Sequence, residues 1–172
     1  MVTPTIRFLL HGETKLLRRL RMAALAESPH AFRERTEEAA QRSDVEWDAL
    51  AEKLAAQVTM AMVLVEHEAE PIGMTFVFLD EADAGGARIG GVWVAPAERR
   101  QHLGKELVHA ACTWVEARAR RRIRLWVATD TAGAVHLYRS CGFAGTGVSK
   151  PFPGQEPRVI AELMRDLGAP TT

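Results

Sequence analysis

The chain has 172 residues, a length that suits one domain with a well-packed core and is short for two. Its apolar fraction of 47% and charged fraction of 26% are those of an ordinary globular protein. Lys and Arg together number 22, as do Asp and Glu, so the net charge gives no argument for a nucleic acid or an acidic membrane. We therefore expect one domain over residues 1–172, with no nucleic-acid or membrane partner.

The two cysteines, Cys112 and Cys141, permit one disulfide at most and lack the spacing of a metal cluster. The six histidines show no HExxH-like spacing, so we expect no metal. No apolar run approaches membrane-spanning length, and no charged-then-apolar signal segment opens the chain. These features predict a cytoplasmic protein, in which both cysteines are better explained by core packing than by reactivity.

The first half of the chain predicts one strand followed by two helices. Periodic leucines predict the first helix, and Ser28-Pro29 ends it because the residue before a proline avoids the helical region. The S-x-x-E capping box of Ser43 and Glu46 predicts the second, with Trp47, Leu50 and Leu54 on its buried face. The predicted bounds are Thr5–Leu10 for the strand and Glu13–Ala26 and Ser43–Ala56 for the helices, with Ala31–Arg42 unassigned.

The second half predicts strands that begin as an antiparallel hairpin and then alternate with helices. The longest helix crosses between two strands, which favours parallel pairing of those two. The total is one mixed α/β or α+β domain. The predicted strands are Met60–Glu66, Ile72–Leu79, Ala87–Val94, Ile123–Ala128, Phe143–Val148 and Val159–Leu167, the helices are Lys105–Arg121 and Ala132–Ser140, and Lys150–Pro157 is a loop.

A basic, glycine-containing turn lies between the strand that ends at Val94 and the long helix. Backbone N–H groups of such a turn, together with the positive end of the following helix, form a site for an anion. Arg99, Arg100 and Lys105 add formal positive charge. The segment predicts a phosphate-bearing ligand held between strand and helix. The alternative is a basic loop that opens an ordinary crossover helix.

Two sequence motifs stand in order around the long helix. The first reads VAPAERRQHLG from Val94 to Gly104, and the second reads TAGAVHLYRSCGF from Thr131 to Phe143. Together they resemble the V-x-P-x-x-R-x-x-G-x-G/A and N-x-x-A-x-x-L-Y-x-x-x-G-F signatures of the GNAT superfamily of acetyl-CoA-dependent N-acetyltransferases. Two positions depart from these signatures. His102 replaces the family's first glycine, and Thr131 replaces its asparagine.

This resemblance implies the GNAT fold, a central mixed and mostly antiparallel sheet with a parallel splayed pair, flanked by helices. It implies acetyl-CoA as co-substrate, with the pantetheine arm acting as a pseudo-strand beside Val92 and Val94. The pyrophosphate is expected on the N–H groups from Arg100 to Lys105. The cofactor-binding residues that it implies are Val92, Trp93, Val94, Arg99, Arg100, Gln101, His102, Leu103, Gly104, Lys105 and Thr131.

Tyr138 is the only tyrosine of the chain, and the resemblance places it where the family has a general acid. A phenol with a pKa of about 10 is protonated at neutral pH, so it can protonate the CoA thiolate as the amine attacks. A half-buried core aromatic is the alternative. Asp130, Glu34 and Glu37 are candidate bases, yet each is better explained as a solvated surface group. We therefore name no base, and water is an alternative proton acceptor.

The sequence says little about the acetyl acceptor. By analogy with the family, the helices of the first half and the Lys150–Pro157 loop wall the acceptor site. Its candidate lining residues are Phe32, Trp47, Trp126 and Phe152. Acids around Glu34–Glu52 could attract a cationic amine, although a solvated face explains them more simply. We expect a small-molecule amine or an amino-acid derivative, with a protein N-terminus or lysine as the alternative.

Two other function classes are compatible with the chain. A non-catalytic acyl-CoA-binding or regulatory domain is favoured by His102 and Thr131, while Tyr138 argues against it. RNA binding through the basic run Arg118–Arg124 is the second, but cations at a helix C-terminus explain that run more simply. A homodimer is compatible with either class.

Overall fold

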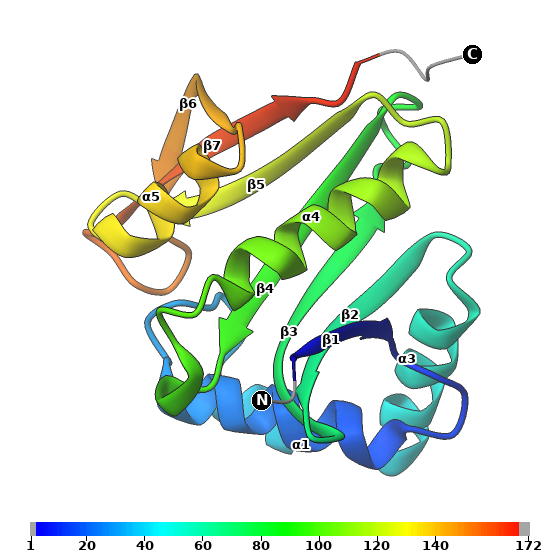
Figure 1. Ribbon diagram of the computed structural model, residues 1–172. Coiled ribbons are helices and arrows are strands. Elements are labelled where there is room, and N and C mark those ends of the chain that lie inside the picture. The colour runs from blue at the N-terminus through cyan, green and yellow to red at the C-terminus, as the bar shows by residue number, and fades with distance from the viewer. Residues whose placement is uncertain (1–2, 169–172) are drawn as a thin grey trace.

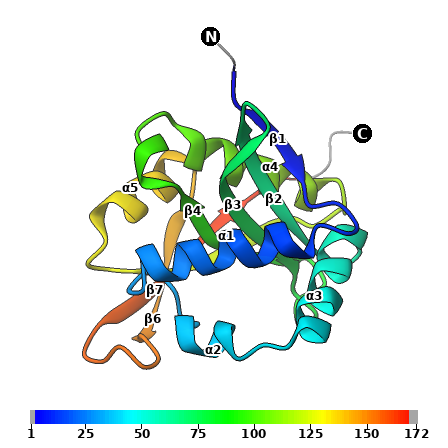
Figure 2. The ribbon, with the colours of Figure 1, turned by 90° about the horizontal axis from the view of Figure 1, so that it is seen from below.

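The computed structural model describes residues 3–168. Its centre is a seven-stranded sheet in the order β1-β2-β3-β4-β5-β7-β6. Figure 1 shows α4 and α5 on one face of this sheet, and Figure 2 shows α1 running across the opposite face. The elements are β1 Thr5–Phe8, α1 Thr14–Glu27, α2 Thr36–Ala40, α3 Asp44–Ala56, β2 Met60–His67, β3 Glu70–Leu79, β4 Gly86–Val94, the 3₁₀ turn Pro96–Glu98, α4 Leu103–Glu116, β5 Arg122–Ala128, α5 Ala132–Ser140, β6 Ala144–Pro151 and β7 Val159–Asp166.

Neighbouring strands pair antiparallel except β4 and β5, which are parallel. The register between β4 and β5 covers only Gly86–Arg88 opposite Arg122–Arg124. Both strands continue beyond these pairs, β4 to Val94 and β5 to Ala128. The strands therefore part, and the mixed, mostly antiparallel sheet with one splayed parallel pair is confirmed.

Each face of the sheet has its own apolar core. On the α4 face, Leu107, Val108 and Ala111 of α4 pack on residues such as Ile123 of β5. On the α1 face, residues of α1 and α3 pack on β2, β3 and Trp93 of β4. The predicted burial of Trp47 and Leu54 of α3 is confirmed, whereas Leu50 is only partly buried.

Local hydrogen bonding explains where the predicted bounds hold. Ser43 and Glu46 form the predicted capping box, in which Ser43 N–H donates to Glu46 at 2.7 Å and Glu46 N–H donates to the Ser43 hydroxyl at 3.3 Å. The hairpin turn is tighter than predicted, because β2 and β3 extend until only Glu68 and Ala69 connect them. Both residues are left-handed, with φ of 51° and 63°, as a two-residue type I′ turn requires.

Two predicted bounds are wrong by three residues or more, and one unassigned segment contains a helix. The long helix was expected over Lys105–Arg121 but spans Leu103–Glu116, because Ala119 adopts a left-handed φ of 57° and turns the chain into β5. The first two residues of the predicted loop, Lys150 and Pro151, belong to β6, since Pro151 pairs with Val159. An edge strand tolerates a proline because one side of it needs no donor. The unassigned charged segment contains the short helix α2.

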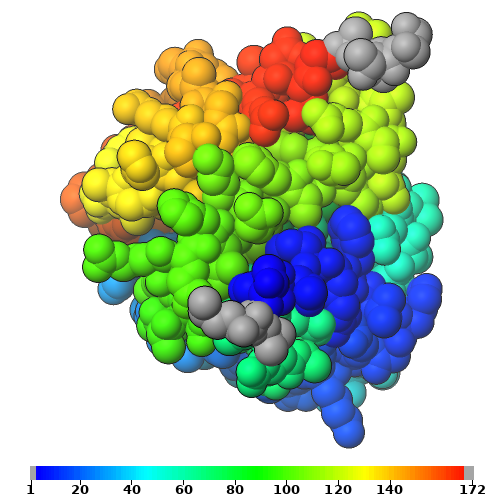
Figure 3. Space-filling model, viewed as in Figure 1, coloured from blue at the N-terminus to red at the C-terminus, as the bar shows by residue number. Residues whose placement is uncertain are grey.

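A cavity of about 320 Å³ lies between β1 and the first turn of α4. Side chains of these two elements border one another in the space-filling view (Figure 3). Its lining includes Ile6, Val65 and Leu103. It lies on the β1 side of α4, whereas α5 and β5 lie on the other side, so it is separate from the gap between β4 and β5. Within residues 3–168, no helix is both long and apolar enough to cross a bilayer.

Candidate active site

The turn between β4 and α4 presents a row of free backbone donors. Arg100 and His102 are both left-handed, with φ of 69° and 62°. The N–H groups of residues 100–104 form no hydrogen bond within residues 3–168. Consecutive free N–H groups in a turn of this kind form a concave nest for an anion, and the N-terminus of α4 adds its positive dipole end. His102 adopts the left-handed conformation that the family's glycine would supply.

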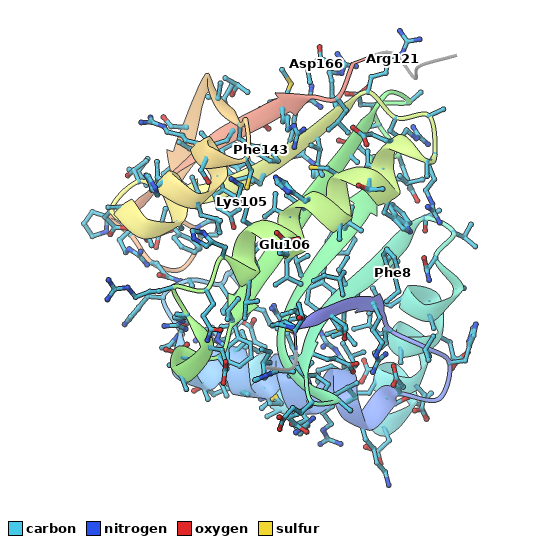
Figure 4. All side chains as sticks on the ribbon, in the orientation of Figure 1. Phe8, Lys105, Glu106, Arg121, Phe143 and Asp166 are labelled. Carbon is cyan, nitrogen blue, oxygen red and sulfur yellow. The ribbon has the colours of Figure 1, made fainter. Side chains whose placement is uncertain are left out.

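The side chains of residues 100–105 differ in their exposure to solvent. Arg100, Gln101 and His102 are exposed, and Leu103 is buried in the core. Gln101 donates to Glu98 at 3.0 Å. Lys105 is half-buried, and in Figure 4 it lies on the side of α4 that faces α5. Lys105 thus adds a cation in the first turn of α4, on the side toward the helix that carries Tyr138.

Arg99 and Trp93 turn toward α1 rather than into the gap. The Arg99 guanidinium donates to the Val94 carbonyl at 2.9 Å and to the Glu27 carboxylate at 2.6 Å. The Trp93 indole donates to the same carboxylate at 3.0 Å. Two nitrogen atoms of the Arg99 guanidinium thus hold the turn against α1, and cofactor binding by Arg99 stays a prediction. Burial raises the pKa of Glu27, but hydrogen bonds from Ser28, Arg99 and Trp93 outweigh it and hold that pKa below its ordinary value.

The edge of β4 that faces β5 carries Val92 and Val94. Ala95 N–H donates to the Ile72 carbonyl of β3 at 2.8 Å, so the backbone groups of the preceding Val94 point the other way, toward β5. The ladder to β5 ends at Arg88, well before these valines. Because Arg99 occupies the Val94 carbonyl, the Val94 N–H remains to meet an extended ligand.

A bulge in β4 lies beside these groups. Met74 pairs with Trp93 and Phe76 pairs with Gly90, so Gly91 and Val92 together oppose the single residue Thr75. Gly91 is left-handed with φ of 64°, as expected for a glycine bulge. A Cβ on Gly91 would lie 2.8 Å from the Phe76 ring, which fixes a glycine there. The buried Thr75 hydroxyl donates to the Gly90 carbonyl at 3.0 Å and holds the bulge.

Helix α5 brings Tyr138 next to α4 and the gap. Gly104 permits this approach, since a Cβ there would lie 3.2 Å from Leu137 of α5. Gly142, with φ of 87°, ends α5 and returns Phe143 under Tyr138, where the two rings meet edge-on at 6.1 Å. Tyr138 is half-buried, and its hydroxyl has no hydrogen-bond partner within residues 3–168. Burial raises the pKa of Tyr138 above its ordinary value, so the hydroxyl stays protonated.

The comparisons with known proteins agree with this geometry. The profile of the acetyltransferase (GNAT) family matches residues 21–143, which hold the bulge, the anion turn and Tyr138. The chain belongs to the GNAT family of acetyltransferases. The resemblance seen in the two motifs is thereby confirmed.

Individual relatives of this GNAT chain are distant. A mycothiol acetyltransferase from Renibacterium salmoninarum is 34% identical over 86 residues, which are 48% of this chain and 25% of that protein. The chain spans about a quarter of the length of the curated relatives it matches. An acetyltransferase of the GNAT family from Streptococcus pneumoniae has a TM-score of 0.81 at 19% identity, covering 96% of this chain and 100% of that one. YncA from Salmonella typhimurium, solved with its cofactor acetyl-CoA, has a TM-score of 0.79 at 15% identity and covers 99% and 97%.

The candidate bases of this GNAT domain have different surroundings. Asp130 accepts two hydrogen bonds from Arg158, both at 2.8 Å, and these hold the pKa of Asp130 below its ordinary value. Glu34 is not the solvated surface group that the sequence suggested, because it binds Arg21 at 2.9 Å and Arg42 at 2.7 Å and is only 20% exposed. Glu37 is exposed, as predicted. Asp130 and Glu34 are thus both paired with arginines, and we name none of the three as the base.

The remaining predicted residues fall into two groups. Thr131 precedes α5 without capping it, and its hydroxyl donates to Asp130 at 3.4 Å. Three of the aromatic candidates are buried and serve mainly as core residues, namely Phe32, Trp47 and Phe152. Trp47 lies beneath the Arg42 guanidinium. Trp126 is half-buried on β5, where the Lys150 ammonium lies 4.1 Å from its ring centroid. Of the four aromatic candidates, Trp126 is the best placed to contact a ligand.

The basic run and the cysteines have structural roles. Arg118 donates to the Trp114 and Gln57 carbonyls, and Arg120 donates to the Ala84 carbonyl. Asp83 binds Arg122 at 2.8 Å and Arg124 at 2.9 Å. These contacts tie the start of β5 to neighbouring loops. Both cysteines are free and buried in the core, as predicted, and burial raises the pKa of each thiol.

Sequence reasoning missed three residues that shape this GNAT site. Gly91 forms the bulge, and the Gly90-Gly91 pair within a strand was a readable signal for it, since glycine in a strand often marks a bulge. Glu27 holds the turn through Trp93 and Arg99. Arg21 approaches the bulge from α1. The last two lie on α1, where no local sequence pattern distinguishes Arg21 from Arg18 and Arg19 or marks Glu27 as a partner of the turn.

Proposed function

We propose that this chain transfers an acetyl group from acetyl-CoA to the nitrogen of a small amine. The proposal rests on three features that lie around the gap between β4 and β5. They are the parted edge of β4, the free N–H groups of residues 100–104, and the protonated Tyr138. An extended, amide-bearing chain that ends in a pyrophosphate requires the first two. A thiolate leaving group requires the third.

The fit of acetyl-CoA follows from these unmatched groups. The edge of β4 at Val92 and Val94 lacks a strand partner from β5, and an amide-bearing pantetheine arm satisfies such groups as a strand would. The N–H groups from Arg100 to Gly104 suit the pyrophosphate, with Lys105 adding charge. When bound, acetyl-CoA supplies the activated acetyl group as a thioester.

The chain's own groups then support the transfer. The neutral amine attacks the thioester carbonyl carbon, the new C–N bond forms, and the C–S bond breaks. A backbone N–H at the β4 bulge polarises the carbonyl as charge develops on its oxygen. Tyr138 donates its proton to the departing thiolate, and the amine loses one proton to water, so the products are the amide and the CoA thiol. Tyr138 regains its proton from solvent.

Binding of acetyl-CoA tests the first half of this proposal. Acetyl-CoA raises the melting temperature and gives a calorimetric Kd in wild type, because a ligand of the native state stabilises it. Lys105→Glu puts a negative charge at the start of α4 and weakens binding about tenfold. Lys53→Glu, an exposed residue of α3, is the matched control and leaves the Kd unchanged. No binding by wild type contradicts the proposal.

Three finer predictions from the sequence belong to this proposal. The acceptor is a small molecule or an amino-acid derivative, with a protein N-terminus or lysine as the second candidate. The protein works in the cytoplasm, and a homodimer is compatible with the fold. A non-catalytic acyl-CoA-binding domain is the competing function. It predicts acetyl-CoA binding without acetyl transfer to any amine.

A further inference from the structure

Arg21 of α1 holds an unpaired buried donor beside the bulge. Its Nε and Nη2 atoms both lie 2.9 Å from one oxygen of Glu34. Its Nη1 atom is buried and has no hydrogen-bond partner within residues 3–168. An unsatisfied buried donor on a charged group is costly, so a position of this kind calls for an explanation.

The unpaired Nη1 points at the β4 bulge. A Cβ built on Gly91 would lie 3.4 Å from Nη1. A Cβ built on the adjacent Gly90 would meet no atom within 4 Å, so the space in front of Gly90 is open. Arg88 and Gly90 face α1, since Ile89 between them packs in the α4-side core. The donor therefore lies at the edge of an open space on the α1 face, next to the strand edge where the thioester is expected.

The charges around Arg21 do not balance. Glu34 is shared by Arg21 and Arg42, so these three groups carry one net positive charge, and Glu46 lies near enough to interact with Arg42. The Arg42 guanidinium also makes a cation–π contact with Trp47, its central carbon lying 4.6 Å from the ring centroid. Arg21 lies between Phe32 and Phe76, at 4.9 and 5.6 Å from their centroids. The arrangement presents a fixed guanidinium edge, which is the group that pairs best with a carboxylate.

We propose that Arg21 binds a carboxylate of the acetyl acceptor, so that the substrate carries its amine and its carboxylate close together, as amino acids do. This proposal rests on the acetyl transfer proposed above. Nη1 is buried and the Phe76 ring lies beside both Gly91 and Arg21, so the proposal requires the Phe76 ring to turn away when a carboxylate binds. Phe76 and Phe32 then offer apolar surface to the rest of the acceptor.

A purely structural role is the rival explanation. Arg21 could only fasten α1 to Glu34 and to the two phenylalanine rings. In that case its loss would lower stability and would reduce activity toward all acceptors alike. If Arg21 binds a carboxylate, its loss changes the preference between acceptors. If its role is only structural, its loss leaves that preference unchanged.

The test compares acceptors that differ only at the carboxylate. Leucine, phenylalanine and methionine are each assayed beside their amides and their decarboxylated amines, at saturating acetyl-CoA, with the product checked by mass. Wild type is expected to favour the acids over the decarboxylated amines in kcat/KM by about tenfold or more, the usual worth of a charged hydrogen bond. Arg21→Met brings this ratio to about one.

Arg42→Met is the matched control, because it removes the other cation on Glu34 but lies over Trp47 rather than at the bulge. It lowers stability and leaves the preference for acids intact. Arg21→Lys is the second variant if Arg21→Met does not fold. It keeps one positive charge but loses the planar fork, so the preference falls without vanishing.

Three results would overturn the assignment. One is a wild type that acetylates the decarboxylated amines or the amides as well as the acids. Another is an equal loss on all acceptors in Arg21→Met. The third is that none of the acids is acetylated and none raises the melting temperature of the CoA-bound protein. Transfer to other amines in that same panel would then show that the acetyl transfer stands while the carboxylate proposal fails.

Discussion

The two faces of the sheet offer different kinds of chemical groups near the β4 bulge. On the α4 face, the site consists of backbone: the free N–H groups of residues 100–104 and the open edge at Val92 and Val94. On the α1 face, it consists of side chains, with Arg21, Glu34 and Glu27 drawn from one helix and the segment that follows it. A backbone site suits a ligand that never changes, and a side-chain site can differ between relatives that share the fold. This difference is why we propose that acetyl-CoA binds at the first face and the acceptor at the second.

The largest expected effect is on the α4 face, at Tyr138. Tyr138→Phe removes the proton donor but keeps the ring that packs on Phe143. We expect kcat to fall about a hundredfold or more, the usual contribution of a general acid, with the Kd of acetyl-CoA unchanged. Single-turnover release of CoA measures the chemical step. An unchanged rate, where chemistry limits turnover, would remove Tyr138 from the mechanism.

On the α1 side of the bulge, Gly91→Ala is expected to have the next largest effect. It combines a left-handed φ of 64° with a contact of 2.8 Å to the Phe76 ring. We expect a loss of about 2–3 kcal/mol in the free energy of unfolding, measured by urea denaturation. Gly90→Ala is the matched control, because its Cβ meets no atom within 4 Å, and it should cost well under half as much. Equal losses would mean that the bulge is not built as described.

Glu27 links the two faces, since it holds Trp93 and Arg99 from α1. Glu27→Gln should lower the free energy of unfolding by about 1 kcal/mol and weaken acetyl-CoA binding through a looser turn. Because the pKa of Glu27 is lowered on folding, its contribution is present above the ordinary value of 4.5 and is lost as the pH falls below it. Urea denaturation of both proteins between pH 7 and about pH 3 checks this. A difference that persists unchanged at the lowest pH would contradict it.

The smallest effect is expected at His102, the departure from the family motif. His102→Gly removes the strain of a left-handed φ of 62° but frees the unfolded chain, so the net gain in stability is about 1 kcal/mol or less. The variant should bind acetyl-CoA at least as tightly as wild type, measured by calorimetry. Weaker binding would mean that the imidazole itself contributes to the anion site.

The same comparison explains what the sequence could predict. The cofactor side was readable because its groups are consecutive: one proline, one basic turn and one helix start over residues 94–105. The order of elements followed from the hydrophobic pattern and the turn residues, and the splayed pair followed from the resemblance that this stretch and Thr131–Phe143 carry together. Helix ends were less readable, since Ala119 leaves the helical conformation although alanine favours it, and side-chain bonds of Arg118 and Arg120 to distant carbonyls decide that turn.

The acceptor side could not be predicted for the same physical reason. Arg21 and Gly91 are 70 positions apart, and only the packing of α1 on β3 and β4 brings them together. The family resemblance predicted Arg99 as a cofactor-binding residue, because it is basic and lies within the first motif. In the structure the Arg99 guanidinium instead donates to the carboxylate of Glu27, 72 positions earlier in the chain. Side-chain partners at this separation become visible only in three dimensions.

The most direct test of the account is acetyl transfer itself. Purified protein is mixed with acetyl-CoA and a panel of small amines, while thiol release and the mass of the acetylated product are followed together. The account predicts equal amounts of CoA thiol and N-acetylated amine for at least one acceptor, with both signals lost in step in Tyr138→Phe. Acetyl-CoA that binds tightly yet gives neither thiol nor amide with any amine would contradict it and favour a non-catalytic domain.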